Sequence, residues 1–151
     1  MGRISIVGQF YSITKCCHDN QSFLIPNNND EMATKNFEII SNSISWLNDN
    51  DYWKCYDYVI MPNHIHLIFR LGERKKLGEV MHSFSSFTAH EISKNLGRTG
   101  AIWQDGYYDH ALRDEDAYLR HVNYIAENPV RAGLVVEVTE WPFTKIDLWT
   151  S

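Results

Sequence analysis

The sequence predicts one α+β domain, spanning residues 1–151, in which strands and helices alternate. Three observations predict it. The chain of 151 residues is long enough for one domain with a sizeable core. No internal repeat and no Gly-, Ser- or Pro-rich linker divides it. Stretches with strand-like composition and stretches with the spacing of an amphipathic helix follow one another along the chain.

The first half of the chain predicts a strand, a helix and a hairpin. Residues 4–14 mix Ile, Val, Phe and Tyr, which is typical of a strand. Apolar residues recur at helical spacing over residues 31–48, with Asp30 as the expected N-cap. Two β-rich runs, residues 52–61 and 64–71, are separated only by a Pro-Asn pair and predict a hairpin.

The second half predicts a helix, a strand and a final helix. Apolar spacing predicts a helix over residues 80–96 that ends near Gly97. The aromatic stretch 101–112 is partly strand-like. Residues 114–127 predict a helix with an acidic first turn, and the Asn-Pro pair at 128–129 is expected to end it. This order is the ferredoxin-like split βαβ arrangement, with helices on one face of the sheet and an additional C-terminal helix.

Composition and charge exclude several classes of protein. The net charge of −5 argues against a protein that coats nucleic acid by bulk attraction. No apolar run reaches the roughly 18 residues of a membrane span, and residues 1–10 lack the pattern of a secretory signal. The three cysteines form no CxxC pair, so we expect neither a disulfide framework nor a thiolate zinc site. A cytoplasmic protein is expected.

Two histidines lie two residues apart in the second strand of the predicted hairpin. Side chains at i and i+2 of a strand share a face, so His64 and His66 point one way and Ile65 the other. The two imidazoles, about 7 Å apart along the strand, can converge on one divalent ion. The HxH pair alone is weak evidence, because two partly buried histidines bonded to backbone groups give the same pattern.

Tyr124 and Asn128 lie four residues apart near the end of the last predicted helix, so their side chains are expected to share one face of it. Taken alone, a core aromatic and an asparagine at a helix end explain this spacing equally well. The pair gains meaning only together with the two histidines.

Three separated motifs resemble one known family. Residues 61–68 (MPNHIHLI), 103–110 (WQDGYYDH) and 124–135 (YIAENPVRAGLV), after an opening strand at 8–14 (GQFYSIT), are similar to the HUH single-stranded-DNA transposases. Within that superfamily, they most resemble the REP-associated tyrosine transposases. The resemblance runs from about residue 8 to residue 141 with the motifs in order, which makes it far more specific than HxH alone.

The resemblance implies roles for four residues. His64 and His66 match the histidines that bind Mg²⁺ or Mn²⁺, and Asn128 matches the third metal ligand. Tyr124 matches the nucleophile, so the product would be a 5′-phosphotyrosine and a free 3′-hydroxyl. By ligand type alone, zinc also remains open.

Other residues are weaker candidates for contacts with DNA. The only net basic third of the chain holds a cluster that either binds phosphate or is a solvated loop: Arg70, Arg74, Lys75 and Lys76. Asp109 and His110 either help to position DNA or metal, or they have no such role, Asp109 being a turn residue and His110 a surface residue. Arg131 either contacts a DNA phosphate or is simply exposed to solvent. Aromatic residues in the second motif stack on bases or belong to the core.

The sequence therefore predicts a metal-dependent endonuclease and strand-transferase acting on single-stranded DNA, expected to be folded into hairpins and associated with the nucleoid. The first alternative is a domesticated hairpin-binding protein that no longer cleaves. The second is a metallohydrolase that uses a water nucleophile and forms no protein–DNA adduct. No membrane partner is expected. Some members of the family that the motifs resemble are monomers with a complete site, and others are dimers whose sites combine two subunits. The oligomeric state is therefore open between monomer and homodimer.

Overall fold

A computed structural model describes residues 9–27 and 29–147 of the chain. Within them the strands form one five-stranded antiparallel sheet in the order β4-β1-β3-β2-β5. The strands are β1 (Phe10–Cys16), β2 (Trp53–Ile60), β3 (His64–Leu71), β4 (Tyr108–Leu112) and β5 (Thr144–Lys145). The helices are α1 (Asp30–Asp49), α2 (Leu77–Leu96), α3 (Glu115–Ala126) and α4 (Asn128–Arg131), with 3₁₀ turns at His18–Asn20 and Val138–Glu140.

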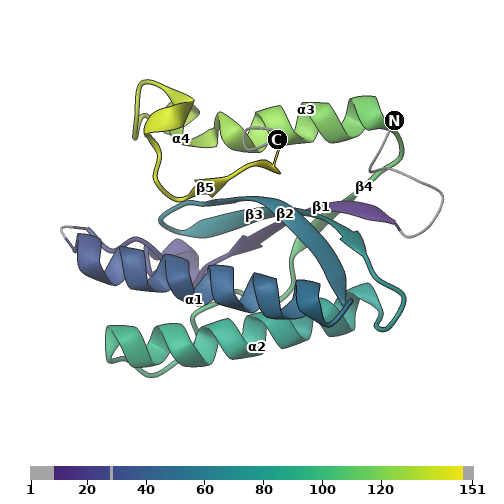
Figure 1. Cartoon of the computed structure of the whole chain (residues 1–151). Helices are drawn as coiled ribbons and strands as arrows, with labels where there is room; N and C mark the ends of the chain where they lie inside the picture. Colours follow the sequence, from purple (N-terminus) through teal and green to yellow (C-terminus); the bar gives the residue numbers. More distant parts are fainter. Residues whose placement is uncertain (1–8, 28, 148–151) are drawn as a thin grey trace.

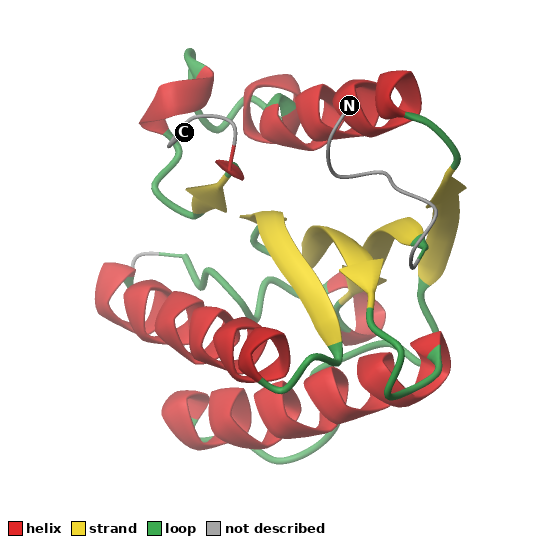
Figure 2. Ribbon diagram, turned by 45° about the vertical axis from the view of Figure 1, so that its right-hand side comes forward, coloured by secondary structure: helices red, strands yellow, loops and turns green. Residues whose placement is uncertain are grey.

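The sheet lies between two layers of helices. α1 and α2 cover one face, and α3 covers the other (Figures 1 and 2). The first four strands and the first two helices follow the predicted ferredoxin-like order, and α3 is the predicted additional helix. The two-residue strand β5 was not predicted, because a strand that short has no periodicity of its own.

The alternation of side chains along the strands separates two apolar clusters. On β3, Ile65, Leu67 and Phe69 point toward α1 and α2 and belong to the larger cluster. Ile68 points toward α3 and belongs to the smaller one, with Val122 and Ile125 of that helix. His66 pairs with Thr14 of β1 and lies on the α3 side. The expectation that both histidines share a face opposite Ile65 therefore holds.

Several predicted boundaries shift. β1 begins at Phe10 and ends at Cys16, and residues 4–8 of the predicted strand lie outside the described residues. The prediction that Asp30 caps α1 was wrong: Asn29 is the N-cap, and its side chain accepts a hydrogen bond from the amide of Met32 at 3.0 Å. Both residues are good caps, so their order along the chain could not be resolved from composition.

The third helix ends next to the Asn-Pro pair, as expected, but a new short helix begins there. α3 ends at Ala126, but Asn128 begins the short helix α4, and Pro129 lies in its first turn. Proline is tolerated there because the first amides of a helix have no partner within it. Asn128 therefore belongs to α4 rather than to the same helical face as Tyr124.

Among the described residues, no helix combines the length and apolar character needed to cross a bilayer.

Candidate functional site

The imidazole of His66 is buried and has one free nitrogen. Its side chain lies between β1 and α3 with an exposure of 7%. Nδ1 lies 3.0 Å from Thr14 Oγ1, whereas Nε2 has no hydrogen-bond partner. Burial, with smaller contributions from His64 and Arg131, lowers the pKa of His66 to about 3. The ring is therefore neutral near pH 7, and when Nδ1 donates to the threonine hydroxyl, Nε2 offers a lone pair.

His64 lies between two amide oxygens. Its Nδ1 is 2.8 Å from Asn63 Oδ1, and its Nε2 is 3.2 Å from Asn128 Oδ1. Burial lowers the pKa of His64, while Asn128 raises it by a smaller amount. A neutral imidazole has one N–H and satisfies only one of these oxygens. With the amides oriented as they are, a cation near Nε2 and Asn128 Oδ1 would remove the mismatch.

The third candidate ligand is an amide. Within residues 9–27 and 29–147, no group of three or more His, Cys, Asp or Glu side chains is placed to hold a metal ion. Asn128 lies close enough to both imidazoles to affect the pKa of each. The donors available together are thus two ring nitrogens and one amide oxygen. An unpaired buried nitrogen beside two further donors fits a divalent cation with open positions for water or substrate.

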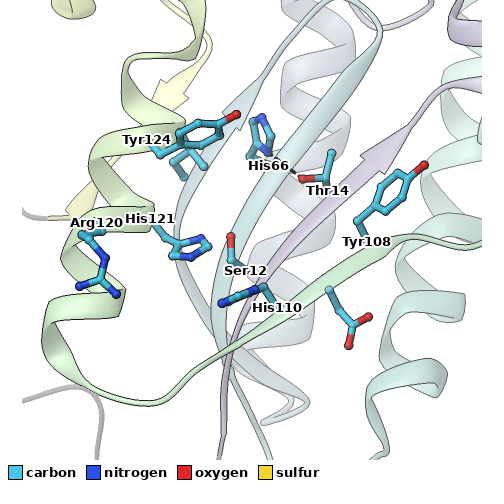
Figure 3. A pocket seen from close by; sticks show the side chains of 10 residues that line it. Ser12, Thr14, His66, Tyr108, His110, Arg120, His121 and Tyr124 are labelled. Carbon is cyan, nitrogen blue, oxygen red and sulfur yellow. Dashed lines mark hydrogen bonds between the residues drawn. The ribbon is translucent and has the colours of Figure 1, made fainter.

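Tyr124 projects from α3 beside this donor group. Its ring centroid lies 6.3 Å from that of His66, and Figure 3 shows the phenol directed toward the histidine. The side chain is 55% exposed, so a large substrate can reach it. Arg131 covers the ring, with its guanidinium carbon 4.0 Å from the centroid, and donates a 2.6 Å hydrogen bond to the carbonyl oxygen of Tyr124. Arg131 thus links α4 to the end of α3.

A local cap, a long-range hydrogen bond and apolar packing hold α3 in place. Asp114 caps the helix by accepting from the amide of Ala117 at 2.8 Å. Tyr118 donates a 2.6 Å hydrogen bond to the buried carboxylate of Asp57 on β2. These contacts anchor the first half of α3, and its apolar residues anchor the rest against the sheet. Tyr124 is consequently presented from a fixed element.

A cavity of about 440 Å³ opens from Tyr124 and His66 along the sheet (Figure 3). Its walls are α3, β1 and β4. His110 of β4 lies on the cavity wall, stacked on His121 of α3 with ring centroids 4.8 Å apart. Asp109 and His110 both lie in β4, so the alternative that Asp109 is a turn residue was wrong, whereas His110 is exposed as its alternative expected.

The basic cluster lies away from this group. Arg70 is in β3, four residues or about 13 Å along the strand from His66, and the rest of the cluster follows at the far end of that strand. Arg74 donates to the carbonyl of Asn50 at 2.9 Å and lies over the ring of Tyr52. The structure does not bring the cluster, Arg70, Arg74, Lys75 and Lys76, together with the histidines.

The remaining aromatic candidates divide by exposure. Trp103 is 7% exposed and its indole donates to Thr88 Oγ1 at 2.9 Å, so it belongs to the core. Tyr108 is 67% exposed and lines the cavity. Of these two, Tyr108 has a ring face that an unpaired base can reach.

Sequence reasoning missed three residues of this region: Thr14, Arg120 and His121. Thr14 is identified only by the β1–β3 register, which places it opposite His66. Arg120 and His121 precede Tyr124 by four and three residues, so helical spacing alone would have placed them on its side of α3.

Comparisons with known proteins agree with the geometry. Residues 22–128 match the family model described as "Transposase IS200 like". The chain is 30% identical over 121 residues to the REP-associated tyrosine transposase of Escherichia coli strain K12, covering 78% of this chain and 69% of that protein. A solved structure, of a REP-associated tyrosine transposase bound to a REP hairpin, has a TM-score of 0.72 and 25% identity, covering 95% of this chain and 80% of that one.

The range matched by the family model spans His64, His66, Tyr124 and Asn128, and the similar sequence and the similar structure are both REP-associated tyrosine transposases by name. The resemblance seen in the three sequence motifs is confirmed. The chain belongs to the IS200-like transposase family, a family of DNA-cleaving enzymes, and it is similar in sequence and fold to the REP-associated tyrosine transposases.

Proposed function

We propose that this chain is a metal-dependent endonuclease and strand-transferase that cleaves single-stranded DNA through Tyr124. The observation that carries the proposal is the unpaired, buried Nε2 of His66 beside the Nε2 of His64 and the amide oxygen of Asn128. These three donors form a set that a divalent cation would complete. Next to them stands a tyrosine exposed to macromolecular substrate.

His64, His66 and Asn128 would hold a divalent cation, Mg²⁺ or Mn²⁺, and Thr14 would fix the tautomer of His66. All three ligands are neutral, so a bound ion keeps its charge and supplies electrostatic stabilisation to a phosphate in the transition state. Burial keeps both imidazoles unprotonated, as metal ligation requires. The chain's own contribution is thus a preformed set of neutral donors.

Tyr124 would act as the nucleophile. Its phenol oxygen would form a bond to the phosphorus while the bond from phosphorus to the 3′ oxygen breaks. The phenolic proton would leave to solvent, and the departing 3′ oxygen would take up a proton and become a free 3′-hydroxyl. Because the phosphodiester is exchanged for a phosphotyrosine ester, a 3′-hydroxyl can reverse the step on another strand. Strand transfer then needs no external energy source.

The substrate proposed is DNA that folds into hairpins. The similar solved structure is described as bound to a REP hairpin, and its chain aligns with 95% of this one. The exposed Tyr124 and the cavity beside it leave room for a strand rather than for a small molecule enclosed by protein. A partner DNA with an unpaired strand next to a hairpin fits both features.

The test is the formation of a covalent protein–DNA adduct. The protein is incubated with Mn²⁺ and 5′- or 3′-labelled hairpin oligonucleotides that carry single-stranded flanks, and the products are separated on a denaturing gel. Wild type should give a shifted protein band with the strand 3′ of the cut attached. Tyr124→Phe should give none while still binding the oligonucleotide, and chelation should abolish the band.

Tyr56→Phe is the matched control, because Tyr56 is also exposed but lies on β2 and does not line the cavity beside Tyr124. It should form the adduct as wild type does. Cleavage without any adduct would identify a water nucleophile instead. Hairpin binding with neither cleavage nor adduct would identify a binding protein. An adduct that persists in Tyr124→Phe would show that another residue is the nucleophile.

A further inference from the structure

The cavity beside Tyr124 continues beyond the proposed metal ligands toward the N-terminal half of α3. Arg120 and His121 line it from that helix, His110 and Tyr108 from β4, and Ser12 from β1 (Figure 3). None of these side chains takes part in the cleavage chemistry proposed above. The cavity is continuous with Tyr124 and His66, so whatever fills it lies directly beside the attacked phosphate.

Two imidazoles meet inside the cavity without a polar partner. The rings of His110 and His121 are stacked, with centroids 4.8 Å apart and an interplanar angle of 29°. Apart from this ring contact, neither imidazole makes a hydrogen bond or an ion pair to any residue in 9–27 or 29–147. Burial first, then His110 and Arg120, lowers the pKa of His121. The two rings thus carry donor capacity that the described residues do not use.

The guanidinium of Arg120 is equally unpaired. Among the residues that the structure describes, it forms no ion pair with a carboxylate. Arg120 precedes Tyr124 by four residues, so the two residues lie about one turn apart on α3. An arginine fork is well suited to the oxygens of a phosphate group.

The acidic residue bordering the cavity, Asp109, belongs to the other side of the sheet. β4 pairs with β1 so that His110 lies opposite Ser12 and Asp109 opposite Ile13, whose side chain is in the α1/α2 core. Alternation therefore directs Asp109 toward that face, where it raises the pKa of Tyr107 after the larger effect of burial. With Asp109 directed away, Arg120 is the cation that lines the cavity in a chain of net charge −5.

We propose that His110, Arg120 and His121 form a phosphate subsite that binds a phosphodiester of the DNA strand next to the one attacked by Tyr124. The inference rests on the proposed function, since it assumes that the strand crosses the site at Tyr124. Arg120 supplies a charged fork, and the ring nitrogens of the histidines donate to the phosphate oxygens. The subsite holds the strand so that the scissile phosphate stays beside Tyr124.

The test measures how DNA affinity depends on salt, because each phosphate contact on a single strand contributes about −0.7 to the slope of log K against log salt. Binding of a labelled hairpin with a single-stranded flank is followed by fluorescence anisotropy over a range of salt concentrations. His110→Ala/His121→Ala and Arg120→Ala should each bind at least about tenfold more weakly at low salt. Arg120→Ala should also lose about 0.7 from the slope, because it removes the cation that neutralises the phosphate, whereas the double histidine variant, which keeps Arg120, should keep the slope. Arg120→Lys should keep the slope.

The matched controls are His90→Ala and Arg113→Ala, since both residues are exposed and outside the cavity. They should retain the affinity and slope of wild type, and adduct formation is measured in the same samples. Cavity variants that bind like these controls would overturn the phosphate subsite and leave Tyr124 chemistry standing. Wild type that binds with the predicted slopes but forms no adduct would overturn the proposed cleavage and leave the subsite standing. Wild type that does not bind would contradict both.

Discussion

The two faces of the sheet are built from the same strands but present different kinds of side chain. Toward α1 and α2 the strands present a continuous apolar cluster, and Trp53 packs on Phe69 with ring centroids 4.6 Å apart. Toward α3 the apolar cluster is smaller and stops where His66 and Thr14 begin. The face toward α3 therefore combines apolar packing with the polar residues of the candidate site, whereas the other face carries the larger core. We therefore expect substitutions on the two faces to affect stability and function differently.

The largest effect on stability is expected on the α1/α2 face. Phe69→Ala removes a side chain that is 1% exposed and leaves a cavity, which should lower the free energy of unfolding by about 3–5 kcal/mol. Urea denaturation measures it. Adduct formation per folded molecule should remain at the wild-type level. A large loss of adduct from the folded fraction would break the separation of the faces.

Thr14→Val should show the reverse behaviour. It removes the hydroxyl that holds Nδ1 of His66, so metal affinity should fall by about 10–100-fold. Stability should fall by only about 1–2 kcal/mol, since one buried ring nitrogen loses its partner. Titration calorimetry with Mn²⁺ measures the affinity, and Thr14→Ser, which keeps the hydroxyl, serves as the control. Equal metal affinity in the valine variant would show that the tautomer is set by another group.

The buried imidazole also predicts how metal-free protein responds to pH. The pKa of His66 is about 3 in the folded chain and near 6.5 unfolded, so the unfolded state binds a proton that the native state does not. The free energy of unfolding therefore falls as pH drops from about 6.5 toward 3. Between about pH 7.5 and 5.5, with chelator present, wild type should lose about 1.4 kcal/mol more than His66→Gln. Identical pH profiles in the two proteins would show that burial does not hold the imidazole neutral.

Arg131→Ala should have the smallest effect. The guanidinium lies over the Tyr124 ring and bonds its carbonyl, yet both side chains are exposed, so stability should change by less than about 0.5 kcal/mol. The rate of adduct formation should fall about three- to tenfold, because the phenol loses its stacking partner. Rapid-quench gels measure the rate, and Arg113→Ala is the control. An unchanged rate would make Arg131 a surface residue only.

Much of this arrangement was predictable because it depends on local patterns. Strand alternation is enough to place His64 and His66 on one face, and helical spacing is enough to locate the segment that carries Tyr124. The role of Thr14 was not predictable, since it depends on the register between two strands and joins residues 52 positions apart in the chain. The same holds for His121, whose stacking partner comes from a different element.

Asn128 lies beside His64, but not through the helical geometry that the spacing predicted. Spacing placed it on the helical face of Tyr124, but the structure places it in α4, after a break at Glu127. It still lies 3.2 Å from Nε2 of His64. The break coincides with the Asn-Pro pair, where proline has no N–H to continue the ladder of α3, but apolar periodicity does not contain the new helix that starts there.

The most direct measurement of the central claim is mass spectrometry of the covalent adduct. Trypsin cleaves after Arg120 and Arg131 and releases residues 121–131, in which Tyr124 is the only hydroxyl-bearing side chain. After reaction with Mn²⁺ and a hairpin oligonucleotide, followed by nuclease trimming, this peptide should carry the mass of a 5′-linked nucleotide. A nucleotide on any other peptide, or cleaved DNA with no modified peptide, would contradict attack by Tyr124.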